Sequence, residues 1–197
     1  LLIWHPEGAH NGGRIESLTA AVDLYATVLD LLGIDESAAD RVHSRSLQPL
    51  LAGDVDAKNL HSHRDRTLYG YWGSAVNVTD GEYAYLQPCD PAVPSRCHST
   101  TMMNARGFPL PTTPKPDAEA GEFVAHADGP VWRFEADSYA QLDDPMLFDA
   151  DDEMPKPNLA EERPDECDRL REELVAGLDE LDVPDHLYAR LTLEPPP

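Results

Sequence analysis

Apolar residues recur every three to four positions between Leu18 and Leu32, which predicts a helix with one buried face. Ser17 can cap an early start of this helix and Asp23 a later one. Gly33 follows the last apolar position and is suited to end the helix, since glycine adopts the left-handed conformation without steric cost.

The same period returns near the end of the chain. It predicts a helix from about Pro164 to Leu181, with Val183-Pro184 ending it. Its apolar stripe consists of Leu170, Leu174, Val175, Leu178 and Leu181. A shorter helical turn is expected over residues 46–53, because Pro49 suits a first turn and Gly53 suits a stop.

Between the two helices the pattern changes to alternation. Residues 76–79 and 82–86 alternate apolar and polar about Asp80-Gly81, a dipeptide typical of tight hairpins. Residues 131–134 and 146–148 predict two more short strands, so we expect a small antiparallel sheet. Residues 88–116 hold seven prolines and predict an extended loop, and Leu1–Trp4 reads as a buried strand.

Composition narrows the function classes. The 197 residues carry 37 Asp and Glu against 15 Lys and Arg, a formal net charge of -22. Nucleic-acid binding is excluded, since its affinity comes largely from basic side chains that neutralise phosphates. No apolar run reaches the roughly 20 residues of a membrane-spanning helix. Asp supplies 22 of the acids, and only three Lys occur, a surface suited to concentrated salt and to an extreme halophile as source.

The charge is unevenly distributed. Residues 116–197 carry a net charge of -18, whereas residues 61–115 carry +1. An anionic ligand would be repelled by the former and tolerated by the latter.

The order of motifs resembles the C-terminal portion of the sulfatase family, the arylsulfatase-like branch of the alkaline phosphatase superfamily. Residues 1–8 are similar to an apolar strand ending in Trp-Pro-Gly, and residues 22–34 to the Asp-Leu-x-Pro-Thr helix. Residues 44–53 resemble Gly-x-Ser-Leu-x-Pro-Leu-Leu-x-Gly, and residues 77–85 an Asp-Gly-x-Tyr-x-Tyr hairpin. Residues 147–149 through 158–160 resemble the closing Leu-x-Asp and Asn-Leu segment.

Three positions depart from these motifs near the helix. Ala26 stands where proline is usual, Ser44 where glycine is usual, and His43 where aspartate is frequent. Asp152-Glu153-Met154 also replaces the usual Asp-Pro-Gly turn. The departures concern local turn geometry.

The resemblance implies an α/β fold, the C-terminal part of an alkaline-phosphatase-like fold with a small antiparallel sheet and a closing C-terminal helix. Residues 1–60 would end the main α/β domain, and residues 61–197 would form a C-terminal subdomain with the Pro-rich loop 88–116 and the acidic helix. The missing N-terminal portion of the same polypeptide is then an expected partner. Localisation stays open between cytoplasmic and exported.

The same resemblance implies hydrolysis of a small-molecule or glycan sulfate ester. Family members use a formylglycine made in a Cys/Ser-x-Pro-x-Arg motif, beside a divalent cation (Ca or Mg) held by Asp and Asn. None of these motifs is matched in the chain, so catalytic and metal-binding residues are expected upstream and the fragment alone should be inactive and bind neither group.

The near-neutral middle of the chain supplies candidates for the wall of a substrate pocket. His61, His63 and Arg66 lie close in sequence to Tyr69, Tyr71 and Trp72, with Arg64 beside them. Basic and aromatic groups in this arrangement suit an anionic ester. A packed aromatic cluster without a ligand is the other interpretation.

The cysteines leave two possibilities open. Cys89 and Cys97 flank a short Pro-containing loop and would close it as a disulfide, or they remain thiols together with Cys167. A zinc site is disfavoured, because the paired spacing of zinc ligands is missing.

Two alternative functions remain at this stage. One is a phosphodiesterase or phosphatase of the same superfamily, which would use an unmodified Thr or Ser upstream and two metals. The other is a non-catalytic acidic binding or structural domain.

Overall fold

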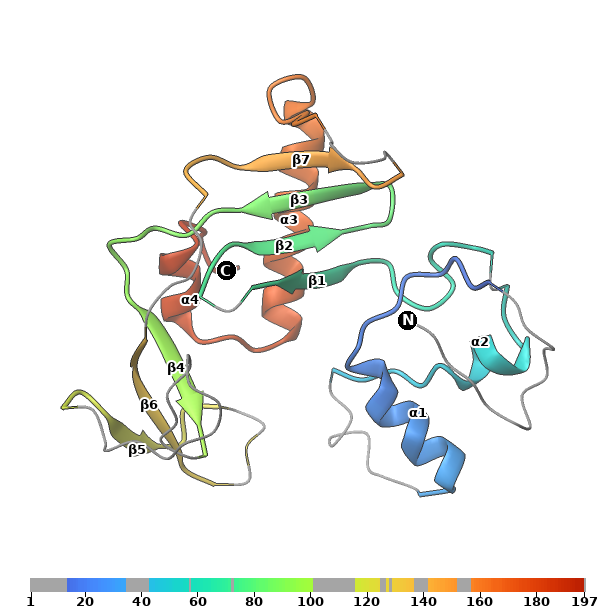
Figure 1. Cartoon of the computed structure of the whole chain (residues 1–197), viewed down its shortest axis with the longest axis horizontal. Coiled ribbons are helices and arrows are strands. Elements are labelled where there is room, and N and C mark those ends of the chain that lie inside the picture. The colour runs from blue at the N-terminus through green and yellow to red at the C-terminus, as the bar shows by residue number, and fades with distance from the viewer. Residues whose placement is uncertain are drawn as a thin grey trace.

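The computed structural model describes residues 14–34, 43–56, 58–71, 73–100, 116–124, 127, 129–136, 142–151 and 157–196. These residues form a mixed α/β protein with two small antiparallel sheets and a long C-terminal helix (Figure 1). The predicted strand Leu1–Trp4 lies outside the described residues.

The first predicted helix is confirmed, with a later start. Helix α1 spans Asp23–Leu32 and ends at Gly33, whose φ of 66° is left-handed. It does not begin at Leu18, because residues 17 and 18 bind a different segment: the Leu18 N–H donates to the Leu60 carbonyl at 2.8 Å. Helix α2 (Gln48–Ala52) has proline in its first turn and ends at Gly53, as the sequence predicts.

A four-stranded antiparallel sheet forms the centre of the molecule. Its order is β1 (Thr67–Gly70), β2 (Val76–Thr79), β3 (Tyr83–Gln87) and β7 (Met146–Asp149). The Asp80-Gly81 hairpin between β2 and β3 is confirmed. Strand β1 was not predicted from the sequence.

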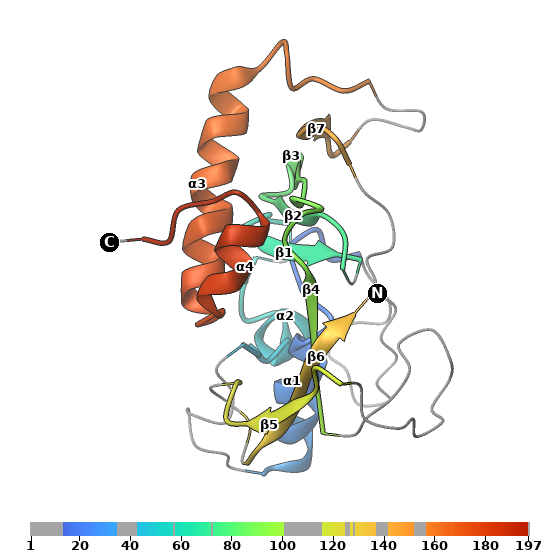
Figure 2. The same ribbon diagram turned by 90° about the vertical axis from the view of Figure 1, so that its left-hand side faces the viewer.

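Helix α3 (Pro164–Glu180) covers one face of this sheet, as predicted (Figure 2). Its buried positions are Cys167, Leu170, Leu174, Gly177 and Leu178. They pack against Val78, Tyr85 and Leu147 from the sheet. The apolar period of the helix and the alternation of the strands thus meet in one core.

The end of the chain closes the same core. Helix α4 (Asp185–Arg190) was not predicted; it is followed by Leu191 and Leu193, which join the cluster. Gln87 donates to the Leu191 carbonyl at 2.9 Å, and the buried Arg190 donates to the Gly73 carbonyl at 2.9 Å and to that of Val93. The C-terminal segment therefore ties together strands and loops about a hundred residues upstream.

A second antiparallel sheet corrects part of the loop prediction. Its order is β4 (Ser95–Ser99), β6 (Val131–Ala136) and β5 (Glu119–Gly121). Strand β4 lies inside the stretch expected as a loop; residues 95–99 contain no proline, and full pairing with β6 makes them a strand. The expected strands at 131–134 and 146–148 are confirmed in β6 and β7.

No helix in the described ranges is both long and apolar enough to cross a membrane.

Candidate functional site

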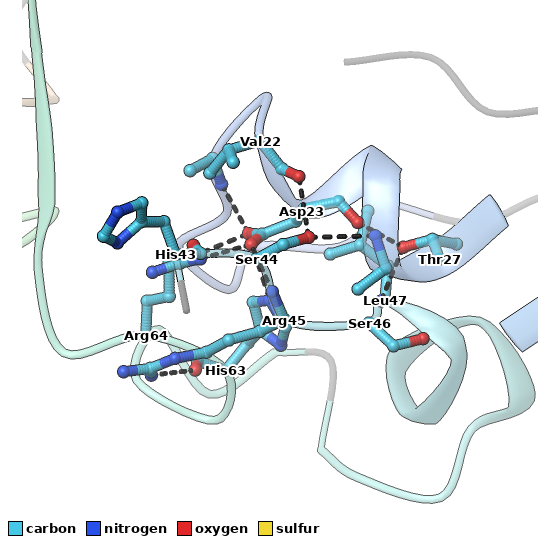
Figure 3. Close-up of polar contacts among 12 residues, drawn as sticks. Val22, Asp23, Thr27, His43, Ser44, Arg45, Ser46, Leu47, His63 and Arg64 are labelled. Carbon is cyan, nitrogen blue, oxygen red and sulfur yellow. Dashed lines mark hydrogen bonds and ion pairs between the residues drawn. The ribbon is translucent and has the colours of Figure 1, made fainter. Parts of the chain in front are cut away.

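The most polar buried cluster surrounds Asp23, the first residue of α1, which is 0% exposed (Figure 3). Its carboxylate accepts the backbone N–H groups of Ala20 at 2.8 Å and Arg45 at 2.9 Å. The Arg64 guanidinium makes a bidentate pair with it, with Nε at 2.8 Å from Oδ2. His63 Nε2 lies 3.2 Å from the same oxygen.

Charge and hydrogen bonding keep this carboxylate ionised. Burial by itself would raise the pKa of Asp23. The hydrogen bond from Arg64 and the two backbone N–H groups outweigh burial and lower this pKa to about 2. The paired carboxylate of Asp23 thus holds three segments of the chain together.

The helix binds the segment before α2 by a second route. Thr27 lies one turn after Asp23, donates to the Asp23 carbonyl at 2.6 Å and accepts the Leu47 N–H at 2.8 Å. Leu47 and Leu50 are buried beneath α1. Residues of two motifs about 20 positions apart therefore interlock.

A third contact involves Ser44 and Ala26, two of the positions that depart from the sulfatase motifs. The Ser44 hydroxyl donates to the Val22 carbonyl at 2.8 Å and accepts the Ala26 N–H at 2.9 Å (Figure 3). The hydroxyl thereby bridges the Val22 carbonyl and the Ala26 N–H. These two groups are four residues apart and would otherwise hydrogen-bond to each other within a helix. Proline at position 26 would have no N–H to satisfy, and glycine at position 44 would have no hydroxyl to supply.

The structure separates the residues expected to line a substrate pocket. His61 is exposed, while His63 packs on Asp23. Arg66 pairs with Glu173 at 2.7 Å and with Glu180, both on α3. Tyr69 is 46% exposed on β1 and Tyr71 is 83% exposed, and Trp72 lies outside the described residues.

A cavity of about 160 Å³ lies between the segment before α2, the approach to β1 and the C-terminal end of α3. Its polar lining comes from His43, Arg45, Arg64, Asp65, Arg66, Thr67 and Glu180. Of the expected pocket residues, only Arg66 is among its walls, together with the neighbouring Arg64. Small-molecule sites usually enclose about 300 Å³ or more, so this cavity alone does not hold an aryl or sugar sulfate.

The charges around the cavity are mostly paired. Asp23 neutralises Arg64, and Glu173 and Glu180 neutralise Arg66. Arg45 is exposed and donates to the His63 carbonyl at 3.0 Å. In the lining, Arg66 Nε and Thr67 Oγ1 lack a hydrogen-bond partner. The arrangement is that of a structural junction with a small polar opening.

Among the described residues, no group of three or more His, Cys, Asp or Glu side chains is placed to hold a metal ion. Cys89, Cys97 and Cys167 are thiols in the structure, which is the second of the two possibilities that the sequence leaves open. Cys89 instead donates to the Ser74 carbonyl at 2.8 Å, and burial raises the pKa of its thiol.

Sequence reasoning treated Asp23 as a cap and did not identify it as the centre of a network. The signal was present: Asp23 and Thr27 are polar residues four positions apart on a helix that is otherwise rich in apolar residues. Two polar side chains on the same face of such a helix indicate that this face forms hydrogen bonds with other segments of the chain.

No family model and no curated protein matches this chain.

Proposed function

We propose that the chain is the C-terminal part of a sulfatase-like hydrolase of sulfate esters, where it completes the α/β fold and walls part of the substrate cleft. The formylglycine and the divalent cation would be supplied by the preceding part of the polypeptide.

The contact between Ser44 and Ala26 carries the proposal. These are two positions at which the sequence departs from the family motifs, and their groups hydrogen-bond to each other at 2.9 Å. Alanine in place of proline adds a backbone N–H, and serine in place of glycine adds a hydroxyl. These two added groups hydrogen-bond to each other. Two departures that compensate each other in this way support the resemblance, because the same local structure can be formed either by the family's pair of residues or by this one.

The placement of the other motif residues supports the same reading. Asp23, Thr27, Leu47 and Leu50 are buried, and Asp80 holds the hairpin turn by accepting the Glu82 and Tyr83 N–H groups. The motif residues act in folding and make no reactive constellation. A C-terminal portion that completes a fold needs residues of this kind.

The test uses the complete polypeptide that the gene encodes, purified in concentrated salt. We expect hydrolysis of p-nitrophenyl sulfate that a chelator abolishes, and a formylglycine detectable by mass spectrometry in a Cys/Ser-x-Pro-x-Arg motif. Replacing that Cys or Ser by Ala is the matched control and should remove activity. An upstream sequence lacking both this motif and an Asp-Asn metal pair would overturn the proposal.

Parallel assays separate the alternatives. Hydrolysis of p-nitrophenyl phosphate or its diester, with an unmodified Thr or Ser nucleophile, would favour the phosphatase or phosphodiesterase. The non-catalytic domain would be favoured by a polypeptide that hydrolyses none of these esters and folds cooperatively as this chain alone.

A further inference from the structure

The three-stranded sheet lies outside the main core. Among the described residues, the buried cluster between α3 and the four-stranded sheet contains none from β4, β5 or β6. The three-stranded sheet has buried residues of its own, Ser95, Val131 and Phe134. In both views it projects past α4, away from the centre of the four-stranded sheet (Figures 1 and 2). A unit with its own small interior can open without unfolding the rest of the protein.

The segment that enters this sheet is held by the end of α4. The buried Arg190 side chain donates to the Val93 carbonyl, and the Arg190 carbonyl accepts the Asp90 N–H at 2.7 Å. These contacts precede the first residue of β4, Ser95, by two and five positions. They fix the point where the sheet begins, and residues 90–93 can therefore act as a pivot for the sheet.

Beyond this pivot, a pair of histidines joins the sheet to α4. His98 is the fourth residue of β4 and His186 the second residue of α4, and their ring centroids lie 5.9 Å apart. The Phe123 ring lies 6.2 Å from that of His98. Nε2 of His98 is buried and has no hydrogen-bond partner in the part of the chain that the structure describes. A neutral imidazole can leave this nitrogen unprotonated, whereas an imidazolium would bury an unpaired N–H donor there.

The charges around the two rings also oppose protonation. They come from every element of the contact: Arg96 on β4, Arg133 and Glu135 on β6, Glu119, which pairs with Arg133, on β5, and Asp185 on α4. Burial lowers the pKa of both rings, and the guanidiniums of Arg96 and Arg133 lower it further. His186 adds to the shift at His98, whereas the exposed Asp185 opposes the shift at His186. Two protonated rings at this distance would repel each other and both guanidiniums.

We propose that the His98–His186 contact is a pH-sensitive latch, which holds the three-stranded sheet against α4 while both rings are neutral and releases it when they take up protons. The sheet then moves about residues 90–93, and the main core stays folded because it does not use this contact. Each ring takes its proton from solvent as it becomes exposed. The inference does not rest on the sulfatase proposal.

Hydrogen exchange followed by mass spectrometry tests the latch in the complete, unsubstituted polypeptide at one fixed salt concentration. The quantity compared is the protection factor, the intrinsic exchange rate divided by the observed rate at the same pH. One pH unit below the ordinary histidine pKa of about 6.5, each ring favours the open state by up to about 10-fold. Between about pH 7.5 and pH 5.5, protection of β4 and β6 should therefore fall about 10-fold, while that of α3 and β2 stays the same.

Two sets of variants separate the latch from an unspecific effect of acid. In His98→Gln/His186→Gln, which has no ring to protonate, protection of β4 and β6 should be independent of pH. Arg96→Gln removes an exposed charge next to the rings, so the fall should become smaller. Arg163→Gln, at an exposed position at the start of α3, is the matched control and should keep the full fall.

Three results would overturn the proposal. The first is protection of β4 and β6 that does not change with pH in the unsubstituted polypeptide. The second is an equal fall in the His98→Gln/His186→Gln variant. The third is a parallel loss of protection in α3 and β2, because the whole protein would then be unfolding and not the three-stranded sheet alone.

Discussion

At the scale of single residues, Asp23 is a buried, ionised side chain that joins three segments of the chain. Four groups converge on its carboxylate: two backbone N–H groups, the Arg64 guanidinium and the His63 ring. Breaking one side of a buried ion pair costs more than the pair contributes, because the remaining charge is left without compensation.

Asp23→Asn keeps the size of the side chain and removes its charge. We expect a loss of about 3 kcal/mol in the free energy of unfolding, measured by urea denaturation at neutral pH. The matched control is Asp54→Asn, an exposed acid after α2, which should change little. Equal stabilities of the two variants would contradict the network.

The pH dependence of that loss has a defined sign. The folded pKa of Asp23 is about 2, below the ordinary value of 3.8, so its stabilisation is complete above pH 3.8 and is lost as the pH falls through about 2. The difference between Asp23→Asn and the unsubstituted chain should shrink over this window.

The bridging hydroxyl of Ser44 leads to a double-mutant cycle. Ser44→Gly removes the hydroxyl that bridges the Val22 carbonyl and the N–H of Ala26, which is 1% exposed, so we expect a loss of about 1–3 kcal/mol in the free energy of unfolding. In an Ala26→Pro background the N–H is absent, and Ser44→Gly should cost much less. A coupling energy near zero in urea denaturation would show that the two positions act independently.

At the scale of elements, alternation and helical period predict most of the core. Helices α1, α2 and α3, the β2–β3 hairpin and strands β6 and β7 follow from the sequence. Strands β1, β4 and β5 do not, because they are defined by their partners more than by their own pattern. The contacts of Asp23 join segments 22 to 41 positions apart, which a local pattern does not specify.

Strand β1 ends at a position that admits only glycine. A Cβ built at Gly70 would lie 2.6 Å from the Ala75 carbonyl oxygen, a backbone atom that cannot rotate away. We expect Gly70→Ala to destabilise the chain by about 1–3 kcal/mol in urea denaturation. Gly121→Ala on β5 is the control, because the atoms nearest to its methyl belong to the Phe123 side chain, which can move more easily than backbone, and it should cost less.

The contact between the three-stranded sheet and α4 includes a histidine pair. The rings of His98 and His186 lie 5.9 Å apart. Burial lowers both pKa values; for His98 the neighbouring His186 adds to this, and Arg96 and Arg133 act on both rings, whereas Asp185 opposes the shift at His186. Folding thus favours the neutral form of each ring.

The sign follows from these lowered values. The contribution of the histidine pair to the free energy of unfolding is fully present above the ordinary histidine pKa of about 6.5. It is lost as the pH falls through the lower pKa values of the folded state. Urea midpoints should therefore drop between about pH 7.5 and pH 5.5, and the drop should be smaller in His98→Gln/His186→Gln. His61→Gln, at an exposed position, should retain the full drop.

At the scale of the whole molecule, the net charge of -22 opposes compaction. Helix α3, which covers the sheet, is rich in acidic residues, and Arg66 and Arg169 neutralise only part of them. Dissolved salt screens the remaining repulsion over about 10 Å at 0.1 M and over less at higher concentration.

Stability should therefore rise with salt. We expect the Tm to increase by more than about 3 °C between about 0.1 M and 2 M NaCl, which corresponds to more than about 1 kcal/mol. The same comparison in Glu172→Lys, which reduces the net charge on α3, should give a smaller increase. A Tm independent of salt would contradict a surface built for concentrated brine.

The C-terminal segment has a consequence for biosynthesis. Leu191 and Leu193 belong to the same core as Val78 and Tyr85, and Gln87 finds its acceptor only at Leu191. Strand β3 emerges from the ribosome about 100 residues before Leu191 does, and a unit of this kind folds as a whole. The strands of the nascent chain therefore stay without these partners until Leu191 and Leu193 have emerged, and the repulsion between acidic residues opposes association with other chains in the meantime.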